Sequence, residues 1–301
     1  MKFVRPIAIT DSVLTSSTVA ETEYTEWAAG TAYTVGTTVR RTVTGVHRCY
    51  TCLVANTGSA PESSTTGTSP KWQDIGPTNR WGMFDSQVGT ATTVATSLTV
   101  VLDPGNIDSL GLLQLLGDSV HVSMTSGATT VYDQTFSLVY GAAIMDWFAY
   151  FFDPINKKTD LVATDLPPYA SGVLTITIST ASGNVSCGMC VVGQAFNLGN
   201  TQYGASIGIV DYSRKDIDTY GNPTITKRKF VKKLDAKVMV DSTIMDAAVI
   251  ALSAWRSTPV LWIGADNLFT SLIIFGFYRD FSVEITYPTM TLCSLSVEGI
   301  I

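Results

Sequence analysis

Apolar and polar residues alternate with a period of two along much of the chain between residues 97 and 192. Four segments show this alternation, at residues 97–102, 119–124, 131–138 and 172–179. The period is typical of strands that bury one face, and turn residues such as Asp103-Pro104-Gly105-Asn106 separate them. Ser182-Gly183-Asn184 predicts a hairpin turn into a further strand over residues 185–192. Strands divided in this way predict a β-sandwich or jelly roll over residues 81–200.

The last hundred residues combine a helical pattern with more strands. Asp241 or Ser242 is the expected N-cap of a helix near residues 242–256. Apolar residues follow with helical spacing, at Ile244, Ala248, Ala251, Leu252 and Trp255, and Pro259 ends the helix. Strands are predicted after it, at residues 260–264, 272–278, 281–287 and 291–297. We therefore expect residues 201–301 to form a β-rich assembly domain with one helix.

Four large aromatic residues lie in turn-rich sequence near the start of the chain: Trp27, Tyr33, Tyr50 and Trp72. Thr, Ser and Gly surround them, and no run in this segment has a helical period. We expect residues 24–76 to form a very small β-module with an aromatic core, whose longest loop covers residues 59–70. Residues 1–20 are expected to be an extended N-terminal segment, which the run Thr15-Ser16-Ser17-Thr18 separates from the module.

The composition agrees with this mainly β prediction. The 301 residues are 46% hydrophobic and only 15% charged, against about 25% charged residues in an average soluble chain. A weakly charged chain rich in Thr and Val is typical of β-sandwiches that pack against other subunits. The net charge of −6 disfavours non-specific binding of nucleic acid, which needs a basic surface. No apolar run reaches the ~18 residues that cross a bilayer, and we expect no secretory signal and no membrane insertion.

The cysteines form two C-x-x-C pairs, Cys49 with Cys52 and Cys187 with Cys190, and Cys293 stands alone. Four thiolates at such spacing suit a tetrahedral zinc site. Positions i and i+3 of a regular strand, however, face opposite sides of a sheet, and only Gly188 offers a turn that lets a pair converge. We therefore favour reduced, mostly buried thiols over a metal site.

Residues suited to catalysis are few. Nucleophilic catalysis needs a base beside the nucleophile, and the two histidines are His47, near a turn, and His121, expected on the solvent side of a strand. Glycoside hydrolysis needs two carboxylates about 5 to 9.5 Å apart. The candidates are Asp146, Asp153, Asp160 and Asp165, and most adjoin turn residues, which favours capping. No cofactor motif is present, and the sequence predicts a protein without enzymatic activity, metal or cofactor.

Two further segments offer contact surfaces. The aromatic run at residues 146–153 is either a platform for sugar rings or a buried strand or subunit contact, and its density of aromatic residues favours the second. Residues 226–237 hold six of the nineteen basic residues. They form either a site for an acidic partner or an amphipathic strand or arm with a solvated face. The apolar residues Phe230, Val231 and Leu234 favour the strand or arm.

Residues 24–76 resemble the small chitin- and cellulose-binding modules that are appended to many polysaccharide hydrolases. The shared framework consists of Trp27, the step Tyr33-Thr34-Val35-Gly36-Thr37-Thr38-Val39, Tyr50, Gly58, Pro61 and Trp72. The resemblance implies sugar binding by aromatic rings, for which the candidates are Trp27, Tyr33, Tyr50 and Trp72. Cys52 replaces an alanine of that pattern, and the two aromatics that stack on sugar in those modules fall at Val54 and Ala55 here.

The whole chain resembles a family of tailed-bacteriophage virion proteins, which are called tail or baseplate components with a carbohydrate-binding module. Four segments carry the resemblance: Phe3-Val4-Arg5-Pro6, Asp74-Ile75-Gly76-Pro77-Thr78-Asn79-Arg80-Trp81, Asp211-Tyr212-Ser213-Arg214-Lys215 and Cys293-Ser294-Leu295-Ser296-Val297-Glu298-Gly299. The middle of the chain is similar in style to galactose-binding-like jelly rolls. The resemblance implies a virion protein that is made in the host cytoplasm and placed in the tail tip, baseplate, collar or fibre base.

We therefore expect a structural protein of a phage tail that assembles with copies of itself or with other tail proteins through residues 201–301 and the jelly roll. Residues 24–76 are expected to project outward and to present a glycan-binding module for host adsorption. Two alternatives stay open: a receptor-binding adhesin for host cell-surface glycan, and an envelope glycan-degrading enzyme. Exposed rings at the four aromatic positions favour the adhesin, and two facing carboxylates in a cleft favour the enzyme.

Overall fold

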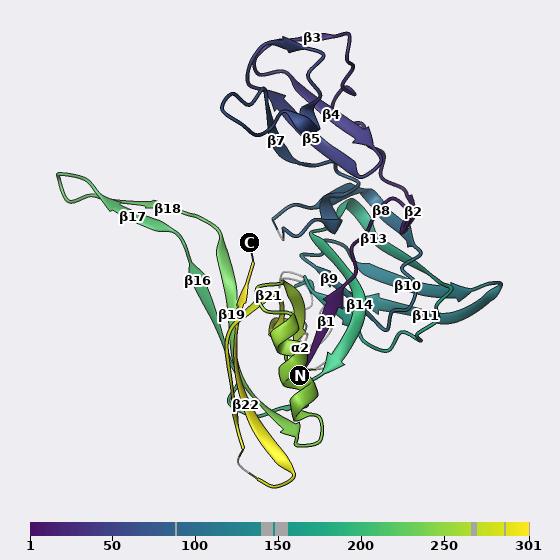
Figure 1. Ribbon diagram of the computed structural model, residues 1–301, viewed down its shortest axis with the longest axis vertical. Coiled ribbons are helices and arrows are strands. Elements are labelled where there is room, and N and C mark those ends of the chain that lie inside the picture. The colour runs from purple at the N-terminus through teal and green to yellow at the C-terminus, as the bar shows by residue number, and fades with distance from the viewer. Residues whose placement is uncertain (88, 140–146, 148–155, 266–269, 286, 301) are drawn as a thin grey trace.

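The computed structural model describes residues 1–87, 89–139, 147, 156–265, 270–285 and 287–300. The protein is mainly β, as predicted, with 54% of its residues in strands. Three regions are seen in Figure 1: a small module, a sandwich-like central region, and a curled sheet that carries helix α2 and a long projecting arm.

The small module is built from two short antiparallel sheets. Its elements are β3 (Ala32–Tyr33), β4 (Thr38–Val43), β5 (Val46–Cys52), β6 (Asn56–Thr57), the 3-10 turn η1 (Pro61–Ser63) and β7 (Trp72–Pro77). Strands β4, β5 and β7 form one sheet, and β3 pairs with β6. Tyr33, Tyr50 and Trp72 pack together with Val39 and Cys52 in a core of their own, which confirms the aromatic core.

A five-stranded antiparallel sheet forms one layer of the central region, in the order β11-β10-β13-β8-β2. Its strands are β2 (Leu14–Ser17), β8 (Thr92–Leu102), β10 (Ser119–Ser126), β11 (Thr129–Ser137) and β13 (Gly172–Cys187), and the 3-10 turn η2 (Gly82–Phe84) precedes β8. Apolar side chains at every second position point inward, as the alternation predicts. Val120, Val122, Met124, Leu174, Ile176 and Ile178 are all buried.

A ten-stranded sheet runs through the rest of the protein, in the order β12-β9-β14-β1-β20-β21-β22-β19-β15, with β16 also paired to β19. Its strands are β1 (Lys2–Pro6), β9 (Ser109–Leu113), β12 (Leu161–Ala163), β14 (Met189–Asn197), β15 (Asn200–Thr201), β16 (Ser206–Asp211), β19 (Phe230–Asp241), β20 (Val260–Ile263), β21 (Ile273–Glu284) and β22 (Met290–Gly299), and the 3-10 turn η3 (Thr270–Leu272) precedes β21. Side chains of β9 and β14 share one hydrophobic core with the five-stranded sheet. The central region is therefore sandwich-like.

Strand β1 joins the central and C-terminal regions. It pairs with β14 on one side and with β20 on the other, so one sheet continues across the predicted boundary near residue 200. The predicted extended segment at residues 1–20 contributes β1 to this sheet and β2 to the other. The run at residues 15–18, which was expected to act as a separator, lies mostly in β2. Phe3 and Val4 are fully buried, which explains why this segment is held in place.

Helix α2 (Met245–Ala254) packs on the C-terminal part of the sheet (Figure 1), where Ala248 and Leu252 are buried. The helix is confirmed, but it begins later than predicted, with Ile244 at the N-cap and no side-chain cap. The Asp241 carboxylate instead accepts hydrogen bonds from the backbone N–H and hydroxyl of Thr243 in the preceding turn. In the described part of the chain, no helix has both the length and the apolar character needed to cross a bilayer.

One predicted turn and one predicted break between strands prove to lie inside long strands. β13 passes through the expected hairpin at residues 182–184 and pairs with β8 on both sides of a bulge between Ser179 and Asn184. β21 likewise joins the two strands predicted at residues 272–278 and 281–287, with an irregularity between Tyr278 and Asp280. Turn residues indicate an irregular backbone, and such residues occur in β-bulges as well as in turns that reverse the chain.

Asp118→Asn is expected to flatten the acid end of the stability curve. Lys157, 2.7 Å away, and hydrogen bonds from Ala181 and Thr180 at the β13 bulge lower the pKa of Asp118 to about 2. The ordinary carboxyl pKa is about 4. Ionised Asp118 therefore stabilises the fold above about pH 4, and this contribution is lost as the pH falls towards about 2. Urea unfolding across this range should show a steeper loss for the wild type, whereas parallel curves would contradict the assignment.

Candidate functional site

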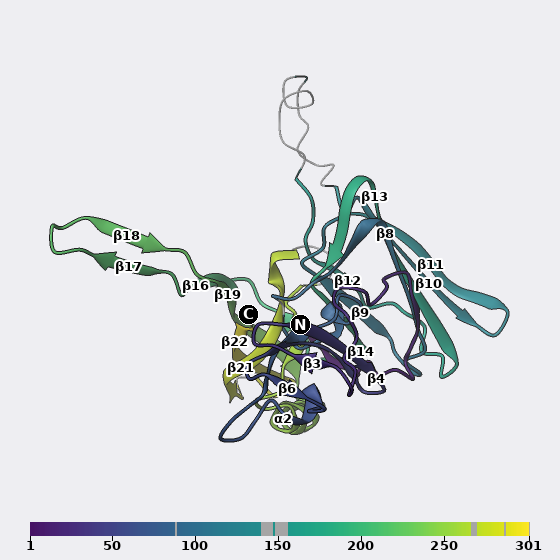
Figure 2. The ribbon, with the colours of Figure 1, turned by 90° about the horizontal axis from the view of Figure 1, so that it is seen from above.

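A two-stranded arm projects from the C-terminal sheet (Figures 1 and 2). We define the arm as residues 206–230. It begins where β16 runs beside the start of β19 and continues as the hairpin of β17 (Arg214–Ile217) and β18 (Pro223–Thr226). Its tip lies far from the rest of the molecule in all three ribbon views. Every residue of the arm except Ser213 is exposed.

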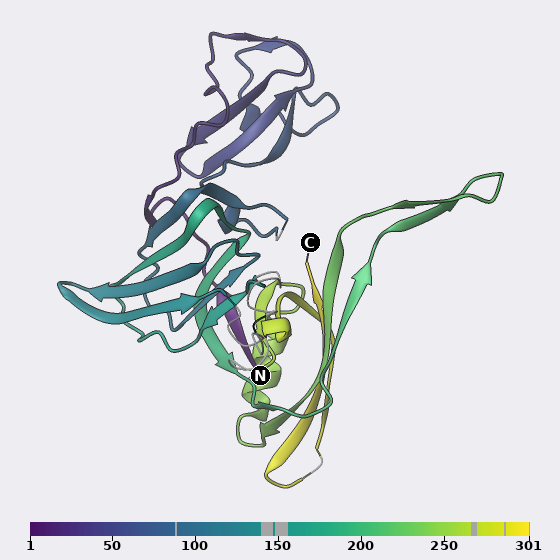
Figure 3. The ribbon, with the colours of Figure 1, turned by 180° about the vertical axis from the view of Figure 1, so that it is seen from behind.

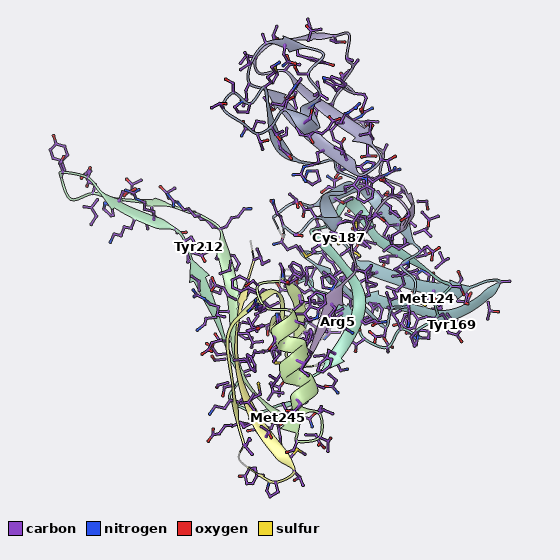
Figure 4. All side chains as sticks on the ribbon, in the orientation of Figure 1. Arg5, Met124, Tyr169, Cys187, Tyr212 and Met245 are labelled. Atoms are coloured by element: carbon purple, nitrogen blue, oxygen red, sulfur yellow. The ribbon has the colours of Figure 1, made fainter. Side chains whose placement is uncertain are left out.

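Hydrogen bonds between residues close in sequence define the bend of the arm and the turn at its tip. At the bend, near Tyr212 (Figure 4), the Asp211 carboxylate accepts a hydrogen bond from the backbone N–H of Ser213. At the tip, the Asp218 carboxylate accepts from the backbone N–H groups of Asn222 and Tyr220, and these bonds, that from Asn222 foremost, lower the pKa of Asp218. The turn is closed by Gly221 at φ +86°, a conformation that glycine adopts readily. The arm therefore has a defined bend and a defined turn at its tip.

The arm leaves apolar side chains in water along its length. The exposed ones are Ile207, Ile209, Val210, Tyr212, Ile217, Tyr220, Ile225 and Phe230. Ile225 is 71% exposed and Tyr220 is 89% exposed. An isolated two-stranded ribbon is at best marginally stable in water, and contiguous exposed apolar surface marks sites of interaction. The arm therefore has the exposed apolar surface of an interface element, and no other part of the described chain covers it.

The arm is basic, whereas the rest of the chain is acidic. It carries five basic residues, Arg214, Lys215, Lys227, Arg228 and Lys229, against three aspartates, so its net charge is +2. The remaining residues hold 14 basic and 22 acidic side chains, a net charge of −8. Within the described residues, only Arg214 of the five cations lies at ion-pair distance from a carboxylate, at 2.6 Å from Asp216. Lys229 lies against Gly89 of the central region, which leaves Lys215, Lys227 and Arg228 to meet an acidic surface.

One ion pair ties the root of the arm to the central region. The ammonium of Lys232, on β19, lies 2.8 Å from the carboxylate of Asp160, which precedes β12. Asp160 is only 6% exposed and also accepts a hydrogen bond from the backbone N–H of Gln114. A cavity of about 360 Å³ adjoins the pair, with Leu113 and Phe275 among its lining residues. The pair therefore links β19, which leads out of the arm, to the residue that precedes β12 at the other end of the sheet.

The four aromatic residues predicted to bind carbohydrate come together in the small module, but mostly as its core. Tyr33, Tyr50 and Trp72 are buried, and the Trp72 indole N–H donates a hydrogen bond to the carbonyl of Ser59 at 3.0 Å. Trp27 is half-buried, and the Arg41 guanidinium lies 4.8 Å from the centre of its ring. These rings therefore present no exposed flat platform on which a sugar could stack.

The two histidines contact carboxylates. His47 joins the module to the residues that precede it: its ring nitrogens lie 2.6 Å from Asp11 and 2.9 Å from Glu21, and its ring stacks on Trp81. His121 lies on the outer face of β10, 2.8 Å from Asp133. Among the described residues neither histidine has a hydroxyl or thiol partner, so no nucleophile–base pair is formed. Sequence reasoning missed the His47 contacts, because its partners are distant in the chain and carry no motif.

The two cysteine pairs lie in different parts of the protein. All five thiols are buried, as expected, with Cys52 in the module core and Cys187 and Cys190 in the central core (Figure 4 labels Cys187). Burial raises the pKa of Cys49 to about 11 and that of Cys187 to about 12, and metals bind the thiolate. Across the residues that the structure describes, no three His, Cys, Asp or Glu side chains gather as metal ligands do.

The carboxylates suit structural roles. Asp146 and Asp153, and the aromatic run between them apart from Trp147, lie outside the described residues. Asp160 pairs with Lys232, and Asp165 accepts a hydrogen bond from the Tyr132 hydroxyl. Six described carboxyl groups have a shifted pKa, and all six are lowered: Asp11, Asp118, Asp211, Asp218, Asp235 and Asp241. A general acid needs a raised pKa, which none of these six offers.

Comparison with known proteins adds no assignment. A scan against models of protein families finds no match, and a search of curated proteins finds none either.

Proposed function

We propose that this chain is a non-enzymatic structural subunit of a bacteriophage tail, in the tail tip, baseplate or collar, and that its arm joins it to other virion proteins or to further copies of itself. The arm carries the proposal, because a projecting ribbon with Ile209, Ile217 and Ile225 in water gains stability only against another surface. Specific interfaces bury at least ~1,000 Å², and an arm of 25 residues exposed on both faces can supply one side of such an interface.

The segments that resemble phage virion proteins support this proposal by their positions. Residues 3–6 lie in β1 and residues 293–299 in β22, two strands of the sheet that carries the arm. Residues 211–215 form the bend of the arm itself. Residues 74–81 lead from the small module into the central region. The resemblance thus includes both the arm and its support.

The proposal assigns no glycan to the small module and no reaction to the chain. Three of the four rings that the glycan hypothesis needs are buried, which removes the main support for an adhesin. The lowered pKa values of the carboxyl groups weigh in the same way against a glycan-degrading enzyme.

Replacing residues 212–229 with Asn-Gly tests the proposal. Asp211 and Phe230 lie opposite each other in the register of β16 and β19, so a two-residue turn closes the ribbon at this point. The removed residues are exposed apart from the half-buried Ser213, and we expect the truncated chain to keep the thermal unfolding temperature of the full chain. We also expect it to be excluded from tails, because the apolar surface of the distal arm is gone.

The measurement is complementation of the encoding phage with its own copy of the gene interrupted. Full and truncated chains are supplied in trans, and complete tails are counted by electron microscopy. A chain with Val35→Ser, an exposed position of the small module, is the matched control and should support normal numbers of tails. Normal numbers with the truncated chain would overturn the proposal.

A further inference from the structure

We infer that the partner of the arm is a second copy of this chain, and that the arm packs along the outer edge of strand β11 of that copy in a head-to-tail contact. This inference rests on the proposed assembly role and adds to it the identity of the partner and the surface that receives the arm. It follows from charge, from an open strand edge, and from the placement of these two features on the molecule.

Charge favours the central region as the receiving surface. Residues 81–200 contain nine aspartates and two lysines, a net charge of −7, whereas the arm has a net charge of +2. Asp133, whose side chain is 64% exposed, lies in the middle of β11, and Asp165 lies beside Tyr132 of the same strand. Among the described residues, Lys215, Lys227, Arg228 and Lys229 have no carboxylate at ion-pair distance. Complementary charge of this kind speeds encounter and selects the partner.

Strand β11 offers an open edge. It is the last strand on its side of the five-stranded sheet, so within the described part of the chain no strand lies beside its outer N–H and C=O groups. Exposed edge strands are usually protected from pairing by Lys, Pro or strong bulging. The nine residues of β11, Thr-Thr-Val-Tyr-Asp-Gln-Thr-Phe-Ser, include neither Lys nor Pro. The strand has one register shift against β10, at Val131, and residues 132–137 are regularly paired beyond it. The edge is therefore open to a strand of the arm, which brings its own unpaired edges and apolar side chains.

The two features lie at opposite ends of the molecule. The arm extends to one side and the β10–β11 hairpin to the other in Figures 1, 2 and 3. The arm therefore cannot reach β11 of its own chain, and a second copy must supply the edge. Because the two contacting surfaces differ, the contact is heterologous, and repetition of it closes a ring or extends a filament. A symmetric contact between two arms would instead bring two basic surfaces together.

Paired charge reversals test the inference on the purified full chain. One variant carries Lys227→Glu, Arg228→Glu and Lys229→Glu on the arm. The other carries Asp133→Lys and Thr135→Lys, both at exposed positions of β11. Lys71→Glu, in the exposed surface of the small module, is the control. Sedimentation velocity over a concentration series at low salt reports association, and thermal unfolding confirms that each variant is folded.

We expect the wild type and the control to form species larger than one chain. Either reversal alone should weaken association about tenfold or more, since it sets like charges against each other. A mixture of the two variants should recover it, because Glu on one chain then meets Lys on the other. Salt at about 1 M should weaken the wild-type contact, since the Debye length falls from ~10 Å at 0.1 M to ~3 Å.

The direction of the contact has its own readout. A chain with residues 212–229 replaced by Asn-Gly keeps β11, and the β11 variant keeps its arm. Mixed together, they have one usable contact and should stop at a complex of two chains. A wild type that stays a single chain at every concentration overturns the inference, as does a β11 reversal without effect. Neither result touches the proposed tail function, which the complementation experiment decides separately.

Discussion

Trp72→Ala is expected to unfold the small module and leave the rest of the protein folded. Trp72 is fully buried, packs edge-on against Tyr33 at 5.2 Å between ring centres, and donates its indole N–H to Ser59. Loss of a buried tryptophan side chain costs about 3–5 kcal/mol. A unit of about fifty residues buries too little surface to withstand such a loss. The two larger cores do not include Trp72, and they should remain intact.

Calorimetry and limited proteolysis measure this outcome. The variant should lose one low-enthalpy transition and become sensitive to protease between residues 24 and 76, while the main transition stays in place. Val35→Ala, at an exposed site of the same module, is the control and should change neither readout. The experiment also separates the two roles of the aromatic residues, since removal of an exposed sugar-binding ring would leave stability unchanged. A stable Trp72→Ala module would contradict the core assignment.

The alternation of apolar residues and the clustering of aromatic residues predicted which side chains of a single strand or helix are buried. Val120, Val122 and Met124 are buried as their spacing requires, and Ala248 and Leu252 turn the helix towards the sheet. The position of β1 could not be predicted in this way. It pairs with β14 and β20, which lie far along the chain: Lys2 is opposite Asn197 on one side and Ile263 on the other. A five-residue strand carries no signal for so distant a partner.

The candidate site was predicted only in part, for two physical reasons. The residues that define the sugar-binding-module pattern, such as Tyr50 and Trp72, are those that any member needs for its core, so their presence indicates the fold better than the ligand. The basic run at residues 226–237 did indicate a strand or arm. It could not show that Ile207 and Ile209 stay exposed while Val231 and Leu234 are buried, because exposure depends on which sheet lies beneath each segment.

Lys232→Met is expected to destabilise the protein more than Asp160→Asn, although both remove the same ion pair. Lys232→Met leaves the Asp160 carboxylate, which is 6% exposed, with the Gln114 N–H as its remaining partner. Loss of one partner of a buried pair costs about 3–5 kcal/mol, and we expect about 2–3 kcal/mol here because Lys232 is partly in water. Asp160→Asn leaves a lysine whose side chain is 37% exposed and can turn to solvent, at about 1 kcal/mol.

Urea unfolding of both single variants and of the double variant measures the coupling between the two side chains. Lys71→Met, at an exposed lysine of the small module, is the control for loss of a lysine charge. The double variant should be more stable than Lys232→Met alone, since no carboxylate is then left uncompensated.

The same variant has a second readout in the position of the arm. Spin labels at Tyr220 and Thr135 should show a broader distance distribution in Lys232→Met, because the root of the arm is no longer held to the central region. A looser arm must be ordered when it binds, so this variant should also associate more weakly than the wild type. Equal destabilisation by the two single variants would contradict the asymmetry, and an unchanged distance distribution would show that the pair does not direct the arm.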